Sequence, residues 1–354
     1  MSEPTLIANA NNPGTGLNGR PEEGNKRSRW FSHMASLRLT TFVLLMLGVG
    51  GFAASKQLPE SQWLVIGPLL LLSVNLVAAL ISNPRLRVQP ALFGMHIGLL
   101  LLALSLAYGH MSRFRGHLEI SEGQYFDPGQ IIEGRKGYLP ARLPMEAAFE
   151  QGAISVNYAP GVMRRETQSH VVLANGQTVE ATDGRPLIIE GYRFYVTHNK
   201  GFAALISWLP AAGSQGHMGT LHFPSYPRLA PTQTQSWTAP DGTSLKFTIS
   251  PTSYSSEEHW TLNRQMSSEQ LNVAYEGAVT ALQPGDIMNL SGGALRFEGI
   301  NMWIGYRIFY DPSLYWCFAA AMIAVCCLVL HVTGRHLKYP IKKLMIPISH
   351  KVRR

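Results

Sequence analysis

Two histidines lie inside long apolar stretches of the sequence, where a polar ring is unusual. His96 is the sixth residue of ALFGMHIGLLLLALSLAY, and His331 lies near the end of LYWCFAAAMIAVCCLVLHV. An ionisable side chain at membrane depth is costly and indicates a function. Neutral imidazole is a good axial ligand for haem iron. We therefore take His96 as the main candidate metal ligand and His331 as a second one.

Each histidine also has a structural interpretation. His96 could hydrogen-bond to Asn75 or Ser73 in a neighbouring apolar stretch, and the sequence does not decide between this role and iron ligation. His331 lies close to the end of its stretch, so its ring could reach the membrane interface, which is the interpretation we favour for it.

The rest of the sequence offers no catalytic motif, and we predict no catalytic residue. The spacing of His217 and His222 does not suit one helix face, so we predict a surface loop there, and His198 in YVTHNKG is expected at a turn. The three cysteines occur only in the last apolar stretch, at Cys317, Cys326 and Cys327. This placement excludes a CxxC redox motif and a disulfide framework in the long polar segment.

Four apolar stretches predict membrane-spanning helices at about 39–54, 63–81, 91–108 and 314–333. A bilayer core of about 30 Å needs roughly 20 helical residues, so the last three are long enough and the first could be extended at its start. A cleaved signal peptide is a less favoured interpretation of the first stretch, because a long n-region precedes it and two more spans follow.

The positive charge predicts the orientation. The net charge is +8, and the excess of Lys and Arg lies beside the apolar stretches, in 1–39, 83–90 and 335–354. Segment 110–313 instead has 15 basic and 18 acidic residues. Basic loops stay in the cytoplasm, so we predict two cytoplasmic termini and a large extracytoplasmic domain on a bacterial inner membrane. This distribution argues against nucleic acid as a partner.

The two ends of the chain are predicted to be simple. The basic N-terminal segment 1–36 is rich in Asn, Gly and Pro, and its first 28 residues are expected to be disordered. The basic tail 334–354 is expected to contact anionic membrane lipid.

Segment 110–313 reads as a β-rich domain. Short runs of β-branched and aromatic residues are bounded by Gly, Pro, Asn and Asp, and VVLANGQTVEA carries the Asn-Gly signature of a tight hairpin turn. The pattern predicts an antiparallel sandwich or open barrel. About 200 residues are enough to bury a core of their own.

Three sequence segments in this order resemble the ResB family, also called CcsB, of cytochrome c biogenesis proteins. They are SLRLTTFVLLMLGVGG, then GMHIGLLLLALSLAYG followed by GHLEISEGQ, and finally INMWIGYRIFYDPSLYW. The family pattern is three spans, a large extracytoplasmic domain and a closing span. Ser313 replaces the glycine that usually follows Asp-Pro in the family. The resemblance covers about half of the chain and omits about 130–290.

The resemblance implies a subunit that delivers haem for cytochrome c maturation together with a ResC or CcsA-type partner. That partner carries a tryptophan-rich haem-handling segment, which this sequence lacks. The family also implies haem b shared with the partner, ligated by His96 at the matching position of the third span. The targets would be apocytochromes c with CxxCH motifs, and this chain would be an accessory subunit of the synthase complex.

Two other functions compete with this one. The chain could be a structural or docking subunit of a respiratory membrane complex that binds no haem. A membrane-anchored sensor is the third possibility, but the tail contains no kinase-like or DNA-binding module.

Overall fold

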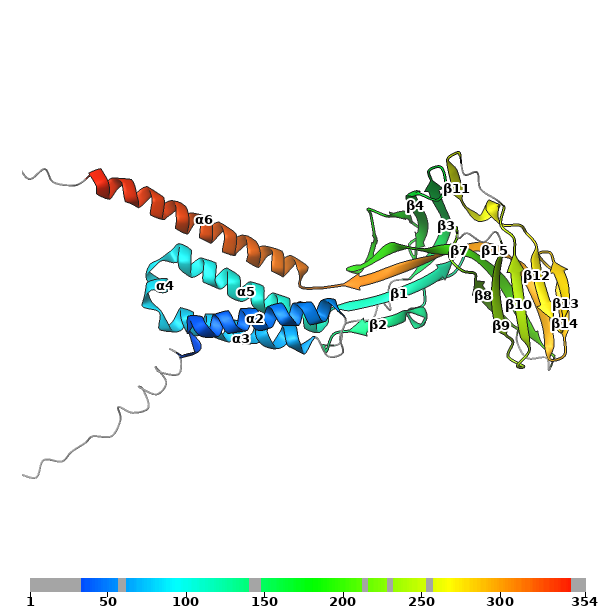
Figure 1. Cartoon of the computed structure of the whole chain (residues 1–354), viewed down its shortest axis with the longest axis horizontal. Helices are drawn as coiled ribbons and strands as arrows, with labels where there is room; N and C mark the ends of the chain where they lie inside the picture. The colour runs from blue at the N-terminus through cyan, green and yellow to red at the C-terminus, as the bar shows by residue number, and fades with distance from the viewer. Residues whose placement is uncertain are drawn as a thin grey trace, which may run out of the picture. The chain divides into compact units, whose positions relative to one another are not determined.

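The computed structural model describes residues 33–56, 62–139, 148–211, 216–227, 232–252 and 257–344 (Figure 1). The chain divides into two compact units. A helical unit comprises Met1–Tyr108 and Leu314–Arg354, and a β unit comprises Gly109–Ser313. The disorder predicted for residues 1–28 and the lipid contact predicted for the end of the tail lie outside the described residues.

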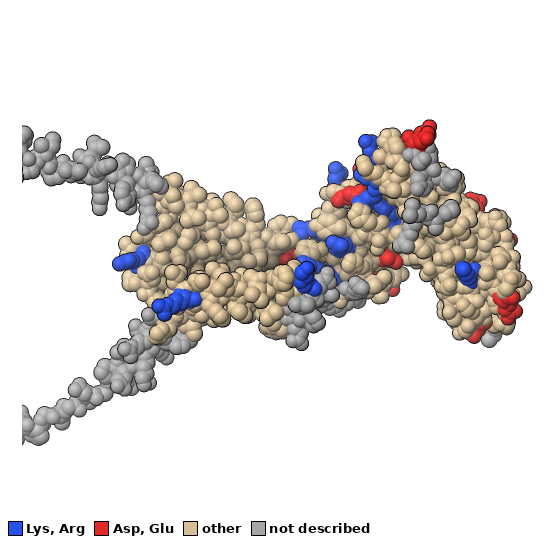
Figure 2. All heavy atoms as spheres, in the orientation of Figure 1, with Lys and Arg blue, Asp and Glu red and all other residues tan. Residues whose placement is uncertain are grey.

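The helical unit contains four long helices and one short one: α2 (Leu37–Ser55), α3 (Trp63–Ser82), α4 (Pro84–Val88), α5 (Pro90–Ser112) and α6 (Leu314–Leu344). The four long helices are long and apolar enough to cross a membrane, so the chain is a multi-pass membrane protein. On the face shown in Figure 2, the Lys and Arg side chains of the helical unit lie at the ends of its long helices and not along them. Helix α6 continues beyond the end of the predicted span and ends at Leu344.

Helices α2 and α3 pack closely and share a polar contact. Gly50 of α2 lies against the backbone of Leu64, where a Cβ atom would clash. Asn75 of α3 accepts a hydrogen bond from the Thr40 hydroxyl at 2.9 Å and donates to the Met34 carbonyl at 2.5 Å. The cost of placing an amide at this depth is therefore offset by bonds to the neighbouring segment.

Helices α5 and α6 contact each other through small residues. A Cβ atom added at Gly94 would lie 2.7 Å from Cys327 Sγ, and one added at Gly98 would lie 2.6 Å from the Ala324 backbone nitrogen. Small residues spaced four apart allow two helix backbones to approach closely in lipid. The two glycines are therefore part of the α5–α6 interface.

The β unit contains three antiparallel sheets, and their strands do not close into a barrel among the described residues. Sheet A consists of β1 (Phe114–Ser121), β2 (Ile132–Lys136), β6 (Leu187–Ile189), β7 (Tyr192–Pro210), β8 (His217–His222), β14 (Ile287–Leu290) and β15 (Gly293–Tyr310). Sheet B consists of β3 (Phe149–Tyr158), β4 (Arg164–Leu173), β5 (Thr178–Thr182) and β11 (Trp260–Leu262). Sheet C consists of β9 (Gln233–Thr238), β10 (Ser244–Ile249), β12 (Leu271–Tyr275) and β13 (Ala278–Leu282). Together with the four helices, these sheets confirm the predicted fold class.

Two long strands, β7 and β15, run antiparallel through the centre of sheet A (Figure 1). On the other side of β15 lies β1, with Phe114 opposite Tyr310 and Ser121 opposite Trp303. Alternate residues of β1 are buried, as expected for a strand with one face on a core. The first and last strands of the β unit are thus direct neighbours.

The predicted hairpin at Asn175 and Gly176 is confirmed. It joins β4 to β5, which pair in register. Gly176 has φ +79°, a left-handed conformation that glycine adopts without steric cost, and the Asn175 side chain accepts the Gln177 amide at 2.9 Å.

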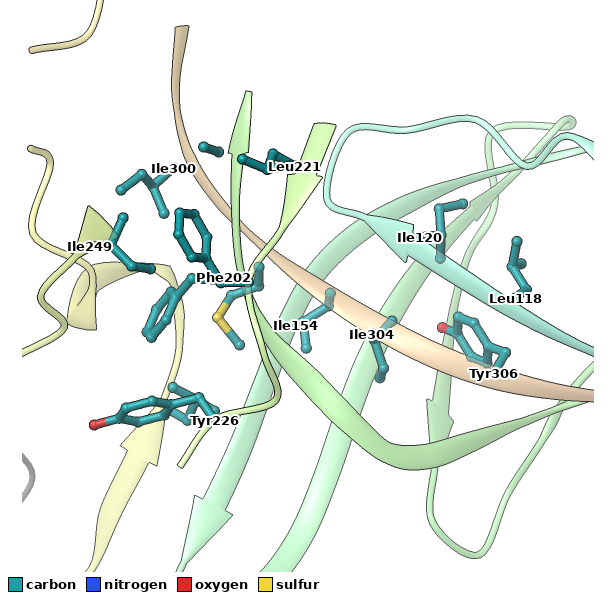
Figure 3. Packing of buried hydrophobic residues seen from close by; sticks show 14 of the residues in the cluster. Leu118, Ile120, Ile154, Phe202, Leu221, Tyr226, Ile249, Ile300, Ile304 and Tyr306 are labelled. Atoms are coloured by element: carbon teal, nitrogen blue, oxygen red, sulfur yellow. The ribbon is translucent and has the colours of Figure 1, made fainter. Parts of the chain in front are cut away.

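The hydrophobic core of the β unit combines all three sheets. Figure 3 shows Leu118, Ile120, Ile304 and Phe202 among its buried side chains. A polar contact crosses it, because the buried Tyr306 hydroxyl donates to Gln151 Oε1 at 2.9 Å. Burial raises the pKa of Tyr306 above its usual range, so the hydroxyl stays protonated.

A second polar pair in the core contains a lysine. Lys200 of β7 is only 1% exposed, and its Nζ donates to Thr167 Oγ1 at 2.8 Å. Close by, Arg164 pairs with Asp183 at 2.9 Å. Burial, and then the charge of Arg164, lower the pKa of Lys200 to about 7, against the opposing effect of Asp183.

This lysine should make stability depend on pH. Its pKa of about 7 in the folded chain is below the ordinary 10.5, so the unfolded state binds more protons between these values. The free energy of unfolding should therefore rise by about 2 kcal/mol from pH 7 to pH 9. Urea unfolding of the full chain in detergent, followed by tryptophan fluorescence, measures this. Lys200→Met should remove most of the rise, and equal pH slopes in both proteins would contradict it.

The α5–α6 contact predicts a specific cross-link. A Cβ atom at position 94 would lie 3.6 Å from Cys327 Cβ, within the range of disulfides. Gly94→Cys in a Cys326→Ser background should form a disulfide with Cys327 under mild oxidation, detected by mass spectrometry of the linked peptides. Gly48→Cys is the control, because nothing lies within 4 Å of a Cβ atom there. Failure of Gly94→Cys to link to Cys327 would refute the packing of α5 on α6.

Candidate functional site

His96 lies in the seventh position of α5, about 9 Å along the helix from its start. Its Nδ1 atom lies 2.8 Å from the carbonyl oxygen of Leu92, one helical turn earlier. A carbonyl oxygen only accepts, so the ring proton of this contact is on Nδ1. In the neutral ring Nε2 then carries the lone pair, and within the described part of the chain it has no hydrogen-bond partner.

The structural interpretation of His96 as a partner of Asn75 or Ser73 is not what the structure shows. Asn75 bonds to Thr40 and to the Met34 carbonyl. The Ser73 hydroxyl donates to the carbonyl of Leu69 in its own helix at 2.9 Å. The free-energy cost of burying the His96 ring at this depth is instead reduced by its hydrogen bond to the Leu92 carbonyl of its own helix. This bond uses one ring nitrogen and leaves the other for another partner.

The face of α5 that carries His96 is set by helical spacing. At 100° per residue, His96 lies on the same stripe as Ala103 and Ala107. These two alanines are buried with Val65 and Leu69 of α3. His96 therefore belongs to the α3-facing side of α5, and its side chain is half-buried.

Gly94 and Gly98 lie on the opposite side of α5. They flank His96 in sequence, and a pair of glycines at this spacing could leave room for a flat macrocycle at the helix surface. The structure places α6 against both glycines, with Cys327 and Ala324 in contact. Because residues two apart on a helix point about 200° apart, the space at the glycines is not available beside the His96 ring.

The second candidate, His331, is not brought close to His96 in a shared site. His331 lies seven residues after Ala324 and four after Cys327, so it continues the stripe of α6 that contacts the glycines of α5. His96 is on the other side of α5. The two imidazoles therefore do not converge on one iron within this chain.

His96 taken alone fits the requirements of a haem ligand on one specific point. Histidines that bind metals usually donate their other ring N–H to a carbonyl or carboxylate, which fixes the tautomer and the ring orientation. The contact with Leu92 does this. Among the described residues no group of three or more His, Cys, Asp or Glu side chains could hold a metal ion.

The histidines of the β unit differ from what their sequence suggested. His217 and His222 are the ends of strand β8, so the prediction of a surface loop was wrong. His198 is inside β7 and exposed, so the predicted turn was also wrong. Strand β8 pairs with the preceding strand, β7, and His198 lies at an irregularity of the β7–β15 ladder, between the paired residues Val196 and Lys200.

Sequence reasoning also missed a polar cluster around His222. The Nε2 atom lies 3.0 Å from Ser121 Oγ, and Nδ1 lies 3.5 Å from Glu119 Oε2. The ring stacks on Trp303, with 5.0 Å between the centroids. No local motif could have revealed this cluster, because Ser121 and His222 are 101 residues apart.

The His222 cluster contains the residue types of a hydrolase triad but not its geometry. Ser121 is completely buried, so its hydroxyl cannot reach a substrate. Both ring nitrogens of His222 have polar neighbours, so neither is available to iron. We assign the cluster to structure, and His96 remains the site residue that the geometry supports.

Comparison with known proteins agrees with these features. The model of the ResB-like family matches residues 91–283, which is more than half of the chain and begins at the start of α5. No curated protein matches the sequence. The matched region includes His96 and most of the β unit. The chain therefore belongs to the ResB-like family of cytochrome c biogenesis subunits.

Proposed function

We propose that this chain is a haem-handling subunit of a cytochrome c maturation complex and that His96 is an axial ligand to haem b within the membrane. The observation that carries the proposal is the His96 ring itself, whose Nδ1 is held by Leu92 while Nε2 is unpaired in the described structure. Membership of the ResB-like family supplies the biological context.

The chain's own contribution would be to bind and orient. Leu92 fixes the tautomer and the rotation of the His96 ring, so that Nε2 is the nitrogen that meets iron. The apolar helices around it would exclude water. When bound, haem would supply the iron for this bond and the macrocycle that is finally joined to the cysteines of a CxxCH segment. No catalytic residue is assigned to this chain.

A ResC or CcsA-type membrane protein would complete the site. His331 belongs to α6, which packs on the side of α5 opposite His96. This placement supports a second iron ligand from the partner. Part of the helical surface is also suited to helix contacts: Gly48 and Gly51 of α2 have open space beside them. Small residues of this kind commonly mark helix–helix contacts in lipid.

The orientation is part of the proposal. With the basic loops in the cytoplasm, both termini would be cytoplasmic and the β unit periplasmic. Reporter fusions after Gly129, Asp241 and Arg354 test this. We expect a periplasmic reporter to be active at the first two positions and a cytoplasmic one at the third. An active cytoplasmic reporter at Asp241 would overturn the orientation.

The haem assignment is tested on the complex purified from its native membrane. His96→Ala should remove most of the haem absorbance and reduce mature cytochrome c, because the imidazole proposed to bind the iron is lost. His96→Gly with added imidazole should restore part of the absorbance. His331→Ala is the matched control and should keep the haem spectrum.

Two outcomes decide against the assignment. Full haem content in the His96→Ala complex would show that His96 is a packing residue. Lower protein abundance with normal haem per surviving complex would lead to the same conclusion. Absence of haem from the wild-type complex would favour the structural or docking subunit instead.

A further inference from the structure

The outermost strand of sheet C, β13, is unusually open. It is an edge strand, since the order of the sheet is β13-β12-β10-β9. Its first four residues are exposed on both faces, and only Leu282 is buried. Val279 is 70% exposed. Within the described part of the chain, β13 therefore has a partner strand on one side only, and few residues cover either of its faces.

The register shows which backbone groups face outward. Strands β12 and β13 are joined by a two-residue turn, Glu276 and Gly277, both with positive φ, and Tyr275 is paired with Ala278. In such hairpins the pair beside the turn is hydrogen-bonded, and bonded residues then alternate along the strand. The N–H and C=O groups of Val279 and Ala281 therefore point away from β12.

Most exposed edges in proteins are protected by charge, proline or a bulge. Among the other edge strands of this unit, β5 follows the rule with Glu180. Strands β9 and β14 carry neither charge nor proline, but partly buried residues alternate along both of them. The sequence of β13 is AVTAL, which has neither charge nor proline. Its edge is thus a template for another strand.

Acidic residues stand at both ends of this edge. Glu276 precedes β13 in the turn, and Asp286 follows it, and both are exposed. On the face shown in Figure 2, acidic side chains gather at the end of the β unit where Figure 1 places β13 and β14. A strand added here would meet negative charge on either side, which favours a basic segment.

We propose that the free edge of β13 binds an extended, basic segment of unfolded polypeptide by strand addition. The proposal rests on the proposed function, in which the target is a haem-free cytochrome c presented as an unfolded chain. Backbone pairing provides affinity without reading side chains, so one edge can accept different target chains. The acidic flanks would select the charge of the bound segment.

The test measures binding of a synthetic, unstructured peptide of about 15 residues with a reduced CxxCH motif and flanking lysines. The full chain in detergent is titrated by fluorescence anisotropy. The double variant Val279→Pro/Ala281→Pro removes the two outward N–H groups but keeps every N–H that bonds to β12. Binding should weaken about tenfold or more, as expected for two lost backbone hydrogen bonds. Val279→Ala/Ala281→Ser is the matched control and should bind normally.

A second measurement leaves the protein unchanged. N-methylation of alternate peptide residues blocks one hydrogen-bonding edge of the peptide. A peptide that is methylated on the residues whose N–H groups face β13 should lose binding. A peptide that is methylated on the other alternate residues should still bind. Replacing the flanking lysines with glutamates should also weaken binding, and Glu276→Gln should reduce that difference.

Three outcomes would overturn the proposal. One is equal binding of the parent and the double proline variant, and another is equal binding of both methylated peptides. The third is a dimer of the parent protein, detected by light scattering, that dissociates in the proline variant while no peptide binds to either protein. That result would assign the edge of β13 to a second copy of the chain. Haem content of the His96→Ala complex is measured separately, so failure at β13 is distinguishable from failure of the proposed function.

Discussion

The pairing of β1 with β15 is the interaction on which the rest of the β unit depends. These strands are the first and last of the unit, and they follow α5 and precede α6 with only a few residues between. Phe114, at the start of β1, lies opposite Tyr310, at the end of β15. All intervening strands must therefore be accommodated within a segment whose two ends are held together. The long β7–β15 ladder extends this pair, and sheet B is connected to it by buried polar contacts such as Tyr306 with Gln151.

Sequence patterns were sufficient for the coarse architecture. Long uncharged stretches predicted all four long helices, because membrane depth requires a length that polar chains rarely supply by chance. Alternation with Gly and Pro breaks predicted an antiparallel β segment, and Asn175-Gly176 located a hairpin. Burial of Lys200 could not be predicted in this way. Its local sequence, HNKGF, resembles a turn, and only pairing with β15, where Ile304 lies opposite, places it in the core.

The site was partly accessible from the sequence. His96 was identified by its depth, and that signal depends on position in the chain alone. Its hydrogen bond to Leu92 is also local, because a histidine can reach the carbonyl four residues earlier in any helix. Helical spacing alone already places Gly94 and His96 on different faces of α5, and the structure shows α6 packed against the glycine face. The His222 cluster was out of reach, since β1, β8 and β15 meet only in the folded sheet.

The β1–β15 pairing also has a consequence for synthesis. Phe114 leaves the ribosome 196 residues before Tyr310, the residue it will face. During this interval β1 has no neighbour on that side, and loop closure over such a distance is slow. Sheets B and C consist largely of strands close in sequence and can form earlier. Sheet A is therefore completed only after most of the chain exists, and the side of β1 that will face β15 stays unpaired until then.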